Sequence, residues 1–66
     1  MNLNKLKGKI VENEMNVEKL ADKIGVDRSS LYRKLNNGEK ITIGEASKIK
    51  DVLNLSDDEA YDIFLA

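Results

Sequence analysis

The feature that most constrains the fold is a two-residue link, Gly25-Val26, between two segments that both have the character of short helices. Before the link, V-E-K-L-A-D-K-I follows Asn16, an amide side chain suited to capping a helix N-terminus, and its apolar residues recur with helical spacing. After the link, Asp27 offers a second N-cap. Gly25 suits the left-handed conformation that commonly ends a helix. Two helices joined so closely must cross steeply, which predicts a helix-turn-helix motif.

The N-terminal segment predicts a first helix over about residues 3–13. Gly8 lies inside this helix, where glycine costs about 1 kcal/mol relative to alanine. Two explanations of this glycine stay open. Another helix or a phosphate approaches the backbone closely there, or the helix simply tolerates the glycine. The apolar side chains that fall on one side of the helix are Leu3, Leu6, Ile10 and Val11.

The third helix should pack through Leu31 and Leu35 and end at N-N-G, residues 36–38. The following E-K-I-T-I is β-branched but has no plausible strand partner. We therefore expect an extended loop with Ile41 and Ile43 held in the core. A fourth helix should follow from about Gly44 to Leu53. Its expected inner residues are Ala46, Ile49 and Leu53, with Val52 beside them.

The fifth helix should begin at S-D-D-E, where Ser56 and Glu59 have capping-box spacing. These acids lack the glycine and the later glutamate of a calcium-binding EF-hand loop, so we expect no metal site. Tyr61 and Leu65 point away from the inner face; they either form a partner surface or wrap the core. The expected inner face is Ala60, Ile63 and Phe64.

The 66-residue length predicts a single domain, residues 1–66, because so short a chain buries only about 60% of its unfolded surface. Histidine and cysteine are absent, which removes the usual general base, thiolate ligands and disulfides. We therefore expect no enzyme activity, no cofactor and no small-molecule substrate. No apolar run approaches the roughly 20 residues that span a bilayer, so we expect no membrane partner and a cytoplasmic location.

Charge is unevenly distributed along the chain. Residues 1–40 hold nine Lys or Arg against six Asp or Glu, whereas residues 41–66 hold two against six. The net charge of −1 therefore divides into +3 and −4. This asymmetry favours an interaction face in the first part and a solubilising face in the second, although random scatter of surface charge gives the same pattern.

The run L-A-D-K-I-G-V-D-R-S-S-L, with the later N-N-G, resembles the Cro/repressor-type helix-turn-helix family of phage and bacterial regulators. Ala21 matches the family's small residue between the two helices, and Gly25 matches its turn glycine. Val17 departs from the glutamine common in the family, and Leu35 falls one position later than the family's second core residue. The resemblance implies an all-α, five-helix, lambda-repressor-like fold and a small Cro-like transcriptional regulator, such as a phage repressor, that binds double-stranded DNA.

Helical geometry indicates which residues of the third helix face outward. With Leu31 and Leu35 inward, a step of about 100° per residue places Ser29 and Arg33 opposite the core, whereas Lys34 lies to the side and should touch the DNA backbone or water. The resemblance implies that the N-terminal part of this helix meets base edges in the major groove. Arginine suits this role because it donates two parallel hydrogen bonds to guanine. The expected base-contacting residues are Arg28, Ser29, Tyr32 and Arg33.

Phosphate contacts are expected at helix N-termini and in the loop after the third helix, where amides and cations position a protein without reading sequence. Lys5, Lys7 and Lys9 either add a backbone contact or form a solvated face. The expected phosphate-contacting residues are Asn16, Ser30, Asn36, Lys40 and Thr42.

One short helix reads only a few base pairs, so the resemblance implies a homodimer on a palindromic operator. Tyr61 and Leu65 form the expected dimer interface. The alternative is a helical protein-interaction module, such as an antirepressor or polymerase-binding protein, that uses the same fold without DNA. The acidic C-terminal half favours this alternative, and the basic outward face of the third helix argues against it.

Overall fold

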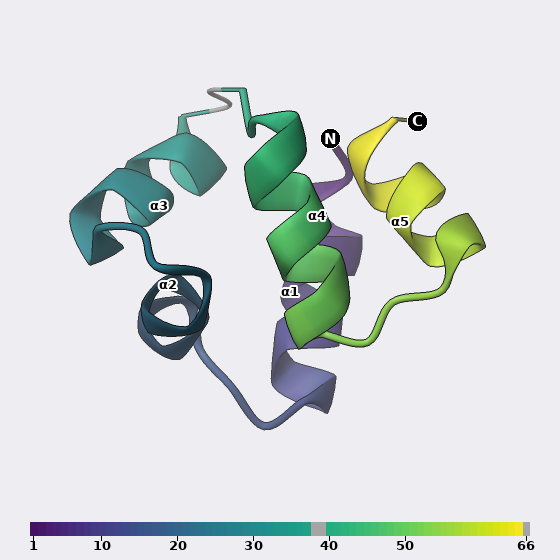
Figure 1. Cartoon of the computed structure of the whole chain (residues 1–66), viewed down its shortest axis with the longest axis horizontal. Helices are drawn as coiled ribbons and strands as arrows, with labels where there is room; N and C mark the ends of the chain where they lie inside the picture. Colours follow the sequence, from purple (N-terminus) through teal and green to yellow (C-terminus); the bar gives the residue numbers. More distant parts are fainter. Residues whose placement is uncertain (38–39, 66) are drawn as a thin grey trace.

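The computed structural model describes residues 1–37 and 40–65, and these form five α-helices without a strand (Figure 1). The all-α prediction is confirmed, and the second and third helices are joined as predicted. The end assigned to Gly38, and Glu39 and Ala66, lie outside the described residues. The helices are α1 (Leu3–Glu12), α2 (Val17–Ile24), α3 (Arg28–Asn36), α4 (Ile43–Val52) and α5 (Asp57–Phe64).

A side chain caps the start of every helix. Each cap accepts a hydrogen bond from a backbone N–H in the first turn, which satisfies a donor that the helix itself leaves unpaired. In α4 and α5 the glutamate three residues later also returns a bond to the backbone of the cap, which completes a capping box. The fourth helix therefore begins at Ile43, one residue before the predicted start. The caps are Asn2, Asn16, Asp27, Thr42 and Ser56.

The helices pack around one apolar core. The second helix contacts α3 and α4, whereas α5 contacts α1 and α4. In Figure 1, α2 and α3 lie on one side of α4, and α5 lies on the other, with the N-terminus near the end of α5. No described polar or charged residue is buried. The buried residues are Leu6, Ile10, Leu20, Ala21, Ile24, Leu31, Leu35, Ile49, Leu53, Leu55 and Ile63. None of the described helices combines the length and the apolar character needed to cross a membrane.

Two predicted core positions are wrong. Ile43 is 90% exposed, because the Thr42 cap makes it the first residue of α4 and turns its side chain outward; only Ile41 packs against the core. Val11 is 72% exposed, because Ile10 takes the inward position and the next residue lies about 100° further around the helix.

Ion pairs attach α1 to α5. The ammonium of Lys5 lies 2.8 Å from a carboxylate oxygen of Asp62, and that of Lys9 pairs with Glu59. Lys5 and Lys9 therefore do not form a freely solvated face, because α1 packs beside the acidic face of α5 and both lysines pair with its carboxylates. The alternative, a contact with the DNA backbone, stays a prediction. Much of the C-terminal negative charge thus pairs with cations inside the molecule.

Candidate nucleic-acid interface

The turn between α2 and α3 places α3 on the surface. Gly25 adopts φ 75°, the left-handed conformation, and its N–H donates to the carbonyl of Ala21. The N–H of Val26 donates to the same carbonyl at 3.0 Å. Asp27 then accepts from the N–H of Ser30 at 3.0 Å and starts α3. Backbone geometry and capping thus fix the direction in which α3 leaves α2.

One side of α3 is buried and the other is exposed. Leu31 and Leu35 lie in the core, as predicted. Ser30 is half-buried at the border between the two sides. The outward side therefore presents a row of polar side chains to a partner: Arg28, Ser29, Tyr32, Arg33 and Asn36 are all exposed. The exposure of the residues expected to contact bases follows the predicted helical geometry.

Arg28 is not extended into solvent but is bound to α2. Its Nε donates to Oδ1 of Asp22 at 3.0 Å, and its Nη2 donates to Oδ2 at 2.6 Å. Its Nη1 lies 3.4 Å from Oε2 of Glu18. The hydrogen bonds with Arg28 lower the pKa of Asp22 below its usual value of 3.8. Sequence reasoning did not identify Asp22 or Glu18, although both acids stand outside the apolar stripe of α2, Glu18 in its first turn and Asp22 in its last.

Lys34 also makes an internal ion pair. Its Nζ lies 3.0 Å and 2.8 Å from the two carboxylate oxygens of Glu45 in α4. The bond with Lys34, together with the backbone N–H of Thr42, lowers the pKa of Glu45. Lys34 was expected to touch the DNA backbone or water; the structure shows it paired with Glu45, and its contact with DNA stays a prediction. The pair instead joins the end of α3 to the start of α4.

The residues expected to contact phosphates lie at three places around α3. Asn16 caps α2 through its Oδ1, which leaves the donors of its amide outside the cap. Thr42 caps α4 by accepting from the N–H of Glu45 at 3.0 Å, and its hydroxyl hydrogen is not used in that bond. Lys40 is exposed between α3 and α4. The structure thus places donors at the starts of α2 and α4, which line different grooves beside α3.

Arg28 and the described lysines fall into two groups, those that form an ion pair within the protein and those that do not. Lys5, Lys9, Arg28, Lys34 and Lys50 each form an ion pair with an acid. Among the described lysines, five carry no ion pair and can meet an anionic partner without first breaking one: Lys7, Lys19, Lys23, Lys40 and Lys48.

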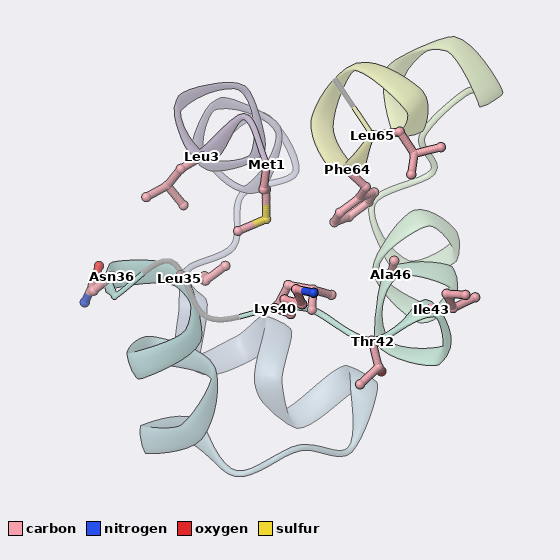
Figure 2. Close-up of a pocket in the computed structure, with 11 residues that line it drawn as sticks. Met1, Leu3, Leu35, Asn36, Lys40, Thr42, Ile43, Ala46, Phe64 and Leu65 are labelled. Carbon is pink, nitrogen blue, oxygen red and sulfur yellow. The ribbon is translucent and has the colours of Figure 1, made fainter.

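An apolar groove borders the C-terminal end of α3. It has a volume of about 550 Å³ and lies between α3, the start of α4 and the end of α5. Figure 2 shows Met1 and Phe64 above this space, with Leu35 and Lys40 across from them. Ile43 and Leu65, both largely exposed, also line it. Tyr61, the other predicted interface residue, is exposed on α5 but does not line the groove.

A second, smaller groove lies on the other side of α3. Its volume is about 340 Å³, and it runs between α1, the start of α2 and α3. Tyr32, Asn16 and Asn36 lie along it beside Lys7. Residues from the predicted base-contacting and phosphate-contacting sets therefore share one surface with a lysine that makes no ion pair.

The arrangement suits binding, since α3 offers hydrogen-bond donors and an aromatic ring on an open surface. Within residues 1–37 and 40–65, no three His, Cys, Asp or Glu side chains form a group that could hold a metal ion.

Comparison with known proteins agrees with this geometry. No curated protein and no solved structure matches the chain significantly. A family model described as the Cro/C1-type HTH DNA-binding domain matches residues 5–63, a span that reaches from the first turn of α1 to the end of α5. The match confirms the resemblance inferred from the sequence of α2 and α3. The chain therefore belongs to the Cro/C1-type helix-turn-helix DNA-binding family.

Proposed function

We propose that this protein is a small, Cro-like transcriptional regulator of the cytoplasm that binds a palindromic DNA operator as a homodimer and catalyses no reaction. The observation that carries the proposal is the outward side of α3, where Arg28, Ser29, Tyr32 and Arg33 are exposed on a helix held by a tight turn. A helix of this size fits the major groove, and arginine pairs with the O6 and N7 atoms of guanine.

Phosphate contacts on both sides of α3 fix its position in the groove in this proposal. The N-terminus of α2, with Asn16, holds one backbone segment, and the start of α4, with Lys40 and Thr42, holds another. Ser30 and Asn36 add contacts from α3 itself. Few cations free of ion pairs surround these positions, so we expect modest affinity for each monomer.

The second copy adds the affinity and specificity that one short helix lacks. We assign the dimer surface to Tyr61 and Leu65 of α5. Leu65 lines the apolar groove together with the exposed Ile43, so a partner that covers Leu65 also removes Ile43 from water. Asn36 of α3 lines the same groove, so this dimer brings the two α3 helices together at their C-terminal ends.

Selection of bound sequences from a random DNA pool tests the proposal. We expect enrichment of two inverted half-sites whose centres lie about one helical turn apart, with guanine in each half-site. Failure to enrich any sequence, together with no gel shift of random DNA at low salt, would favour the protein-interaction module instead.

Substitution of Arg33 separates base reading from general attraction to DNA. We expect Arg33→Ala to lower the preference for the selected site over random DNA by about fivefold or more, and to lower random-DNA binding less. The matched variant Arg33→Lys keeps the charge but lacks the planar fork, so it should lose the guanine preference and keep random-DNA binding. Equal losses on both DNAs in Arg33→Ala would count against a base-reading role.

A further inference from the structure

Asp22 controls which hydrogen-bond donors Arg28 presents. A guanidinium group has two forks of parallel N–H donors, one formed by Nε with Nη2 and one formed by Nη1 with Nη2. Asp22 occupies the first fork, at 3.0 Å and 2.6 Å. The second fork, at the tip of the side chain, includes Nη1, which makes the longer bond to Glu18 at 3.4 Å. A guanine edge accepts two parallel donors, and the tip of Arg28 presents them when this longer bond to Glu18 gives way while the pair with Asp22 stays intact.

The bidentate pair also restricts the motion of Arg28. Two parallel hydrogen bonds define the plane of the guanidinium as well as its position. An arginine held in this way loses less conformational entropy when it binds than one that moves freely in solvent. The residues involved lie on both sides of the two-residue turn, so the geometry of the helix-turn-helix motif itself brings them together.

The two carboxylates change what Arg28 attracts. Asp22 is negatively charged at neutral pH, as an ordinary aspartate is, and its bonds with Arg28 lower its pKa further. A DNA phosphate that approaches the same guanidinium meets this negative charge and that of Glu18, and like charges repel. A guanine edge carries only partial negative charges on O6 and N7 and no net charge, so the repulsion that it meets is weaker. The surroundings of Arg28 therefore disfavour a phosphate contact more than a base contact.

We propose that Asp22 is a specificity-determining positioning residue, which aims Arg28 at a guanine and suppresses its use as a general phosphate contact. This inference rests on the proposed function, because it requires that α3 read an operator. The pair is more than half exposed, with side-chain exposures of 56% for Arg28 and 53% for Asp22. Exposed pairs of this kind contribute little to stability, so substitution of Asp22 should leave the protein folded.

The test compares Asp22→Asn with the unmodified protein on the selected operator and on random DNA over a range of salt concentrations. We expect the variant to bind random DNA more tightly and the operator-to-random affinity ratio to fall by about fivefold or more. The plot of log affinity against log salt on random DNA should steepen by about one unit, because Arg28 becomes available to a phosphate. Asp51→Asn is the matched control: it removes one exposed carboxylate that makes no described contact with α3, and it should leave the ratio unchanged.

A double-mutant cycle with Arg28→Ala distinguishes positioning from a general charge effect. In the Arg28→Ala background, Asp22→Asn should no longer change the affinity ratio, because the side chain on which it acts is gone. An unchanged ratio in the single variant, or an equal change in both backgrounds, overturns the inference while operator binding stands. If the unmodified protein prefers no DNA sequence, the proposed function and the inference fail together. Thermal unfolding of each variant verifies that it is folded.

Discussion

At the scale of single residues, two glycines illustrate how differently the backbone constrains this chain. Gly25 ends α2 in the left-handed conformation, at φ 75°, where a side chain is strained whatever space surrounds it. Gly8 lies on the exposed face of α1, and a Cβ added there meets no atom within 4 Å. No close helix approach therefore explains Gly8. The turn requires the first glycine, whereas packing among the described residues does not require the second.

The same substitution should therefore have opposite effects at the two glycines. We expect Gly8→Ala to raise the free energy of unfolding by about 0.5–1 kcal/mol, because alanine is the better residue in a helix interior. We expect Gly25→Ala to lower it by about 1–2 kcal/mol, because the new Cβ crowds the backbone in the left-handed conformation. Urea unfolding of both variants measures the two changes. A neutral Gly25→Ala would contradict the role given to the turn.

At the scale of the helices, electrostatics and packing together fix α5 to the rest of the fold. Ile63 is fully buried, and the N–H of Asn2 donates to its carbonyl at 2.7 Å. Around this contact, Lys5 and Lys9 pair with acids of α5. The hydrogen bond with Lys9, and then that with the backbone of Ser56, lowers the pKa of Glu59 to about 2. Glu59 thus serves both the start of α5 and its attachment to α1.

The pH dependence of stability should depend on Glu59. Its pKa in the folded state lies below the ordinary value of 4.5, so its contribution to stability is fully present above about pH 4.5 and is lost as the pH falls towards 2. Glu59→Gln retains the capping box, because glutamine also serves at this position, but removes the ion pair with Lys9. We expect the variant to be less stable at pH 7 and to lose less stability on acidification.

Urea unfolding at a series of pH values from 7 down to about 2 measures this difference. Asp58→Asn is the matched control, because Asp58 lies in the same first turn of α5 and forms no ion pair among the described residues. The control should retain the pH dependence of the unmodified protein. If Glu59→Gln retains it as well, the ion pair with Lys9 does not contribute as described.

At the scale of the whole molecule, the fold leaves apolar surface next to its proposed DNA-binding helix. The groove between α3, α4 and α5 holds Ile43, 90% exposed, and Leu65, 73% exposed. Exposed apolar surface of this kind commonly marks a partner site. Its position beside the end of α3 means that one surface can join two copies and set the distance between their reading helices.

Leu65→Glu should abolish cooperative binding of two copies to paired half-sites without weakening the binding of one copy to a single half-site. We expect the affinity for DNA with one half-site to stay near that of the unmodified protein, while the cooperative gain on DNA with two half-sites is lost, because the new charge opposes burial of the dimer surface. Titrations of both DNAs measure the ratio of the two affinities. Asn4→Glu is the matched control, because Asn4 is exposed on α1 and lines neither groove. An unchanged ratio in Leu65→Glu would remove α5 from the dimer surface.

Much of the fold was predictable because it depends on interactions between residues close in sequence. The caps Asn16, Asp27 and Ser56 each bond a backbone N–H three positions later, so residue identity and spacing alone indicate where their helices begin. The left-handed end at Gly25 and the inward pair of Leu31 and Leu35 are equally local. The outward side of α3, where the candidate site lies, follows directly from that inward pair.

The sequence did not indicate which acid each charged side chain would pair with, because no local rule determines these ion pairs. Arg28 with Asp22, Lys34 with Glu45 and Lys9 with Glu59 each join different helices, and many lysines and acids along the chain have the same local surroundings. Which of them meet depends on how the helices pack, and so does the exposure of Ile43. Capping and apolar spacing act within about one helical turn, so the amino-acid sequence alone specifies the helices and the face that α3 presents. Packing acts across the whole molecule, and it alone decides which cations remain available to DNA and which are held by the protein's own acids.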